Sequence, residues 1–167
     1  MDDRLVQDRT TVAASPAVVF AIVADPRQHP RIDGSGSVRG VITGPERLSD
    51  GATFGVSMRM FGLPYRISNR VVELEPDRLI AWRHVGAHRW RYELEPTALP
   101  DGTLGTVVTE TWDASRHSAV GFAALRLLGF PARNQAAITA TLVRLKAAAE
   151  TDQAGVDGDT ADRDGVR

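Results

Sequence analysis

Glu110 is the residue whose position in this sequence most clearly suggests chemistry. It lies between Val108 and Trp112 at a spacing of two, so all three side chains share one face of an extended strand. A carboxylate among apolar neighbours is costly to bury without a partner, and a raised pKa would suit general acid or base catalysis. Alternatively, Glu110 lies at a bulge or pairs with an arginine such as Arg83 or Arg91.

His84 is a second candidate for proton transfer, or an anchor for a ligand, because alternation places it on one face with Trp82. The alternative is the structural role that a lone histidine in a strand more often has. His84 and His88 are four residues apart, a spacing that suits a metal ion on a helix. Gly86 predicts a turn between them, however, and no third ligand is evident, so we expect no metal and no cofactor.

Aromatic and methionine side chains are predicted to gather on the same concave face. Trp and Tyr offer apolar area with one polar atom, and Met adapts its shape, so together they favour a pocket for a flat or flexible apolar ligand. The alternative is that they only fill the core. The predicted ligand-binding residues are Phe54, Val56, Met58, Met60, Asn69, Trp82, Trp90, Tyr92, Trp112, Ala124, Leu128, Ile138 and Leu142.

The phase of the strand that contains Asn69 is open. Asn69 would face the ligand together with Ile67 and Val71. The opposite phase is nearly as defensible, and it would turn inward Ser68, Arg70, Val72 and Leu74.

The strands that must hold these side chains follow from period-two alternation between short turn segments. Connections this short predict hairpins and therefore an antiparallel meander. Ser15 followed by Pro16 predicts that a helix starts directly after the first strand. The seven predicted strands cover residues 4–13, 37–43, 53–60, 65–75, 78–84, 88–96 and 106–113.

After Ser115 the apolar spacing changes to three and four, which predicts helices. Ile138, Leu142 and Leu145 form the apolar stripe of a last helix of about 18 residues, which should cover the concave face. Residues 121–131 are either a mobile lid or an ordinary helix kink. Strand, helix, six strands and a long helix make an α+β fold, whose curved sheet leaves space beneath the last helix.

Composition limits the class of protein. The chain has 167 residues, no cysteine and a net charge of −1, which fits one globular domain and argues against a nucleic-acid-binding surface. No window is apolar for long enough to span a membrane, and the N-terminus lacks a secretory signal, so we expect a cytoplasmic protein. Residues 1–150 form the predicted domain, and residues 151–167 a disordered acidic tail.

Three segments carry a resemblance to a known family. They are TVAASPAVVF at 11–20, Asp25-Pro26, and VELEPDRLIAW at 72–82. In this order they resemble the START/Bet v 1-like (SRPBCC) superfamily, in particular its bacterial polyketide cyclase/dehydrase and lipid-transport group. The resemblance covers about residues 4–150 and implies a helix-grip fold, in which a curved seven-stranded antiparallel sheet wraps around a long C-terminal helix. It also implies a pocket that opens near residues 25–36 and near the turn before the last helix.

The superfamily includes carriers, receptors and enzymes, so the fold alone does not give the activity. We expect a domain that binds or carries a hydrophobic or amphipathic small molecule, such as a lipid or polyketide-like compound. The first alternative is a cyclase or dehydratase that uses Glu110 and His84 for proton transfer. The second is a protein-interaction module, and a homodimer is compatible with any of the three.

Overall fold

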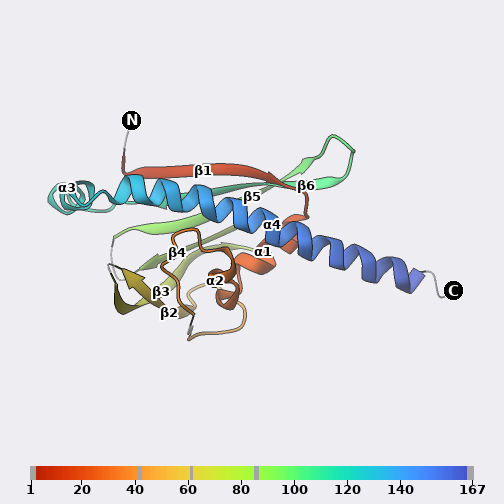
Figure 1. The fold of residues 1–167 in the computed structure, drawn as a ribbon, viewed down its shortest axis with the longest axis horizontal. Helices are drawn as coiled ribbons and strands as arrows, with labels where there is room; N and C mark the ends of the chain where they lie inside the picture. Colours follow the sequence, from red (N-terminus) through yellow and green to blue (C-terminus); the bar gives the residue numbers. More distant parts are fainter. Residues whose placement is uncertain (1–2, 41–42, 61, 85–86, 165–167) are drawn as a thin grey trace.

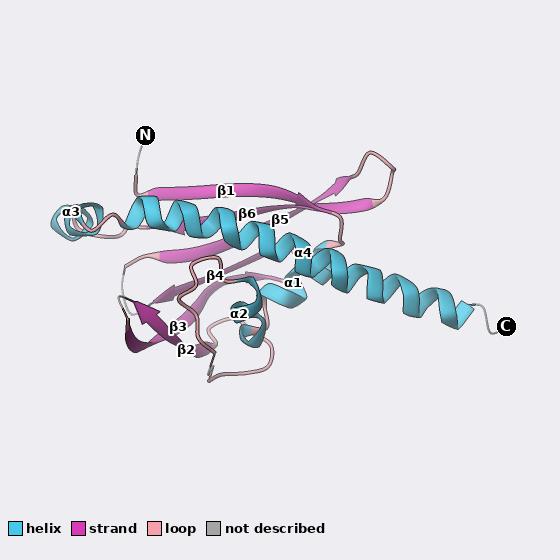
Figure 2. Cartoon of the chain, viewed as in Figure 1, coloured by secondary structure: helices cyan, strands magenta, loops and turns pink. Residues whose placement is uncertain are grey.

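The computed structural model describes residues 3–40, 43–60, 62–84 and 87–164, with the backbone alone for residue 60 and residues 160–164. A single antiparallel sheet is crossed by one long helix (Figures 1 and 2). Its elements in chain order are β1 (Leu5–Val12), α1 (Pro16–Val23), η1 (Pro26–Gln28), α2 (His29–Ile32), β2 (Thr53–Met60), β3 (Leu63–Glu75), β4 (Leu79–His84), β5 (Arg89–Ala98), β6 (Leu104–Asp113), α3 (Ala119–Leu127) and α4 (Phe130–Asp164).

The strand order is β1-β6-β5-β4-β3-β2, so β1 closes the meander by pairing with the last strand. The register aligns Trp82, Trp90 and Trp112 across β4, β5 and β6. The next inward row aligns Tyr92 with Glu110. Since directly paired residues project from the same face, the sheet brings the predicted tryptophans and Glu110 together.

The described sheet has six strands, so the prediction of seven was wrong. Of the described residues at 37–40 and 43, Val38 forms an isolated bridge to Met58 of β2 and Thr43 forms one to Gly55. Gly36 and Gly40 adopt φ values of 65° and 112°, which interrupt the extended backbone that a strand requires. These described residues therefore lie beside β2 at the edge of the sheet and form no strand there.

The phase of β3 changes within the strand. Tyr65, Ile67, Asn69 and Val71 face inward, and an irregularity in the pairing with β4 follows directly after Val71. Beyond it, Leu74 packs against the core. The first part of β3 thus has one of the two phases considered from the sequence, and the part after Val71 has the other. The cause is a bulge, which inserts one unpaired residue into the strand.

Helix α1 begins as predicted, with Pro16 in its first turn and the Ser15 hydroxyl accepting a hydrogen bond from the Val18 amide. Asp25 in turn caps η1 by accepting from the Arg27 amide at 3.0 Å. These two caps set the path of the chain from β1 into α2. They thereby bring α2 to the edge of the concave face.

Helix α4 covers the same face as the tryptophans, since side chains of both line one cavity. Ile138, Leu142 and Leu145 are buried in the core beneath it, as predicted. Gly34 lies directly against the α4 backbone, and a Cβ atom there would overlap the Ala137 carbonyl and the Thr141 amide. This close approach holds the segment after α2 against α4.

The last helix is longer than predicted, with 35 residues, because it continues to Asp164. Residues 151–164 are therefore helical, and the prediction of disorder there was wrong. Gln153 accepts a hydrogen bond from the Ser15 amide at 3.0 Å, and Asp152 pairs with Arg31 at 2.8 Å. Disorder was predicted because this segment has little apolar surface to bury. Polar contacts with the start of α1 and with α2 hold its first residues instead.

A break separates α3 from α4 at Gly129, which adopts a φ of 74°. Residues 121–131, which the sequence predicted to form either a mobile lid or a helix kink, thus contain the junction of two separate helices. In the described part of the chain, no helix is both long and apolar enough to cross a membrane.

Candidate functional site

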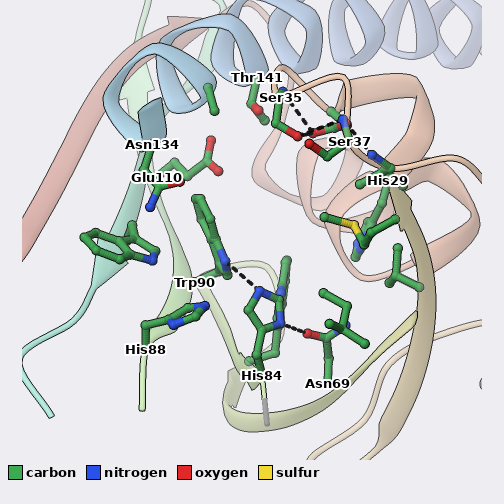
Figure 3. Close-up of a pocket in the computed structure, with 18 of the residues that line it drawn as sticks. His29, Ser35, Ser37, Asn69, His84, His88, Trp90, Glu110, Asn134 and Thr141 are labelled. Atoms are coloured by element: carbon green, nitrogen blue, oxygen red, sulfur yellow. Dashed lines mark hydrogen bonds between the residues drawn. The ribbon is translucent and has the colours of Figure 1, made fainter. Parts of the chain in front are cut away.

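A cavity of about 390 Å³ lies between the concave face of the sheet and α4 (Figure 3). Strands β2 to β6 form its floor and sides. Helix α2, the segment 33–38 and the first turns of α4 close it from the other side. The space that the sequence predicted between a curved sheet and one helix is therefore present.

Most of the predicted site residues line this cavity. Those that do are Phe54, Val56, Met58, Asn69, Trp82, His84, Trp90, Tyr92, Glu110 and Trp112.

Four predicted lining residues lie elsewhere. Ile138 and Leu142 are buried in the core under α4 and are not among the residues that line the cavity. Ala124 and Leu128 are exposed on and just after α3, because α3 turns its other side, with Phe122, toward the protein. The side chain of Met60 and the turn expected at Gly86 lie outside the described residues.

Further residues, which were not among the predicted ligand-binding residues, also line the cavity. They are His29, Ile32, Asp33, Ser35, Ser37, Val38, Tyr65, Ile67, His88, Phe130, Asn134, Ala137 and Thr141. The four on α4 are spaced by four, three and four residues, so they form a helical stripe next to the apolar one. That spacing was a usable signal, and the lining residues from His29 to Ser35 lie within residues 25–36, near which the resemblance implied an opening of the pocket.

Glu110 is 2% exposed, and its carboxyl group points toward the α4 side of the cavity (Figure 3). Its Oε1 accepts a hydrogen bond from the Tyr92 hydroxyl at 2.7 Å, whereas Oε2 has no partner. Burial raises the pKa of Glu110 to about 8, since no cation compensates the charged form. Neither alternative expected from the sequence, a bulge or an arginine partner, applies to Glu110. Its partner is Tyr92, and the pairing of β5 with β6 has no bulge at this position.

The imidazole of His84 is bonded at both nitrogens. The indole Nε1 of Trp90 donates to His84 Nε2 at 3.0 Å, and His84 Nδ1 donates to the amide oxygen of Asn69. An indole can only donate, so the proton of the neutral ring sits on Nδ1. Burial and the neighbouring His88 lower the pKa of His84 to about 3. His84 therefore fixes the Trp90 ring, and it has no nitrogen left for proton transfer.

His29 forms part of a rigid aromatic wall. Its ring stacks on Trp82 at 5.1 Å between centroids, and Trp82 stacks in turn on Tyr92 at 5.5 Å. His29 Nε2 donates to the Val23 carbonyl at 2.9 Å, which orients the ring. Burial lowers the pKa of His29, so the wall is uncharged at neutral pH.

Asp33 supplies the other carboxylate at the cavity. Its two oxygens accept hydrogen bonds from the Ser35 amide and hydroxyl and from the Val38 amide, at 2.7 to 3.0 Å. No three His, Cys, Asp or Glu side chains of the described part of the chain are arranged to hold a metal ion.

Comparisons with known proteins agree with this geometry. Residues 4–150 match the family described as polyketide cyclase / dehydrase and lipid transport. The uncharacterised protein Rv0088 of Mycobacterium tuberculosis (strain ATCC 25618 / H37Rv) is 48% identical over 136 residues, which are 80% of this chain. The matched region spans 59% of that relative's length.

Two solved structures share the fold at low sequence identity. Protein NE0264 from Nitrosomonas europaea superposes with a TM-score of 0.65 at 14% identity, over 92% of this chain and 99% of its own. The di-domain ARO/CYC StfQ from the steffimycin biosynthetic pathway gives a TM-score of 0.59 at 18% identity, over 92% of this chain and 53% of its own. The chain thus belongs to the polyketide cyclase / dehydrase and lipid transport family of the START/Bet v 1-like (SRPBCC) superfamily.

Proposed function

We propose that this domain binds and carries a hydrophobic or amphipathic small molecule of lipid or polyketide-like character. The observation that carries this proposal is the cavity of about 390 Å³ between sheet and helix, walled mainly by aromatic and aliphatic side chains. Ligand pockets have volumes of roughly 300–1,000 Å³ and combine apolar walls with a few placed polar groups. The description of the matching family, polyketide cyclase / dehydrase and lipid transport, supports a ligand of this character.

An enzymatic role of cyclase or dehydratase type is the rival proposal, and Glu110 is the observation that favours it. A carboxyl group with a pKa near neutrality can both donate and accept a proton. The second proton-transfer group that the sequence suggested, His84, has both nitrogens engaged by Asn69 and Trp90. Of the two groups that the sequence suggested for proton transfer, only Glu110 remains available, which supports a carrier better than a two-group catalyst.

The test is binding of N-phenyl-1-naphthylamine, an uncharged fluorescent probe. We expect micromolar affinity and quenching of tryptophan emission, because Trp82 and Trp90 line the cavity. Ala137→Phe should weaken binding by filling space at the α4 side. Ala124→Phe is the matched control, since it adds the same ring on exposed α3 and should leave affinity unchanged.

Native mass spectrometry of the protein as purified should in addition show a bound small molecule that Ala137→Phe reduces. Absence of probe binding to the wild-type protein, or equal binding by both phenylalanine variants, would contradict the proposed site. The Glu110→Gln variant distinguishes the carrier from the enzyme. A carrier should still bind its ligand, whereas an acid–base enzyme should lose turnover by roughly 10²–10⁴-fold.

A further inference from the structure

The proposed function does not define the chemical class of the ligand. The buried carboxyl group of Glu110 limits which classes can bind. Resting on that function, we propose that Glu110 donates a hydrogen bond to the ligand from its protonated carboxyl group. The cavity would then select an uncharged, largely apolar molecule that carries a carbonyl oxygen or a comparable acceptor. It would reject molecules whose polar end is a carboxylate.

The hydrogen bonding of the carboxyl group determines which oxygen faces the ligand. Tyr92 donates its single hydroxyl proton to Glu110 Oε1 at 2.7 Å, so Oε1 is already an acceptor. Oε2 has no partner and is shielded from solvent. In the protonated acid the O–H group is therefore on Oε2, and it is a buried donor without an acceptor. Leaving such a group unsatisfied is costly, and a ligand acceptor removes the cost.

The charges around the cavity also disfavour an anion. None of the described residues that line the cavity is lysine or arginine. Its carboxylic acids are Glu110 and Asp33, and the Asp33 carboxylate adds to the burial that raises the pKa of Glu110. A ligand carboxylate would enter without a counter-ion and beside Asp33, which is unfavourable in a low-dielectric site.

Titratable groups also lie on the elements packed around Glu110. On β5 the neighbour is Tyr92, whose pKa is raised well above 10 by burial and by Glu110. On β1 the paired residue is Asp8, whose oxygens accept from the Arg9 amide and the Thr139 hydroxyl.

On α4 the groups that line the cavity, Asn134 and Thr141, carry no charge, and the segment before it contributes Asp33. Tyr65 and three histidines are further titratable groups among the described residues that line the cavity, and burial raises the pKa of Tyr65 above its ordinary value of 10. The pKa values of His84 and His88 are lowered to about 3 and about 4, mainly by burial, and that of His29 is lowered by burial.

Among the cavity groups with a shifted pKa, Glu110 alone titrates between pH 7 and 9. Its deprotonation removes the donor and places a negative charge beside the ligand acceptor. Affinity for a carbonyl ligand should therefore fall by up to about tenfold per pH unit above pH 8, whereas affinity for a ligand without an acceptor should not.

The experiment compares three rigid probes of matched shape by tryptophan quenching from pH 6 to 10. 9-Fluorenone carries a carbonyl, fluorene lacks it, and fluorene-9-carboxylate carries an anion. At pH 6 we expect fluorenone to bind several-fold more tightly than fluorene, and the carboxylate at least tenfold more weakly than fluorene. The preference for fluorenone should disappear by pH 10, whereas fluorene affinity should stay constant.

Two variants of Glu110 test its role as the donor. Glu110→Gln keeps an N–H donor but cannot titrate, so its preference for fluorenone should persist at pH 10. Glu110→Leu removes the donor and should abolish the preference at every pH. Circular dichroism spectra and melting temperatures of both variants verify folding, and fluorene affinity verifies that the cavity is intact.

The possible results separate this inference from the proposed function. If fluorene and fluorenone bind equally and without pH dependence, the inference is overturned while the carrier function stands. The same holds if fluorene-9-carboxylate binds as tightly as fluorene, or if the fluorenone preference of the wild-type protein survives at pH 10. Failure of all three probes to bind contradicts both.

Discussion

Replacing Glu110 by glutamine should change how the stability of this protein depends on pH. The side chain is 2% exposed, one carboxyl oxygen has no partner, and the pKa is raised from 4.5 to about 8. Glutamine has nearly the same shape and can still accept from Tyr92, but it does not titrate. The difference in unfolding free energy between the two proteins therefore isolates the titration of this one group.

The sign follows from proton binding. Between pH 4.5 and 8 the folded state keeps the proton on Glu110 while the unfolded chain has lost it. Stability that Glu110 contributes is thus fully present below pH 4.5 and is lost as pH rises toward 8. A shift of this size corresponds to about 3 kcal/mol lost from pH 4.5 to 7, and about 4 kcal/mol lost from pH 4.5 to 9.

The measurement is urea unfolding of wild type and Glu110→Gln at half-unit steps from pH 4.5 to 9, followed by tryptophan fluorescence and circular dichroism. The variant should gain about 3 kcal/mol relative to wild type by pH 7, and the gain should level off above pH 8. Glu95→Gln removes an exposed carboxylate on β5 and controls for the loss of one negative charge.

A stability difference that stays constant within about 1 kcal/mol across this range would refute the reasoning. It would mean that the folded protein holds Glu110 ionised at neutral pH. This result would also contradict the proposed hydrogen bond from Glu110 to the ligand, because the ligand would then meet a carboxylate instead of a donor.

Three further predictions concern the parts that position the site. Tyr92→Phe should lower the unfolding free energy by about 1–3 kcal/mol, measured by urea unfolding at pH 6, because Glu110 Oε1 loses its donor. Gly34→Ala should cost about 1–3 kcal/mol in the same assay because its Cβ meets the α4 backbone, whereas Gly155→Ala, with open space around it, should be neutral or stabilising. Deleting residues 155–167 should shift the calorimetric melting temperature little, since the contacts of Asp152 and Gln153 remain, and a fall of several degrees would show that the deleted part docks.

The sequence by itself determined the features that depend on neighbouring residues. The bounds of β2, residues 53–60, were predicted because alternation and the flanking turn residues are local signals. The N-cap at Ser15 is local in the same way. Period-two alternation also placed Trp82, Trp90 and Glu110 on one face, since a strand turns successive side chains to opposite sides.

Tertiary structure decided which groups meet across the fold. Nothing in the sequence indicated that Tyr92, 18 residues before Glu110, would be its partner, because that pairing depends on the β5–β6 register. The two bonds that occupy His84 come likewise from Asn69 and Trp90 on other strands.

Helical periodicity distinguished an apolar face of α4 from a polar one, but it did not predict which of the two lines the cavity. Ile138 and Leu142 therefore fill the core, while the adjacent stripe with Ala137 and Thr141 lines the cavity. The tail illustrates the same limit, because residues with little apolar surface are ordered by polar contacts of Asp152 and Gln153 with distant segments. A local pattern fixes the direction of a side chain, whereas the free energy of its surroundings is set by residues far away in the chain.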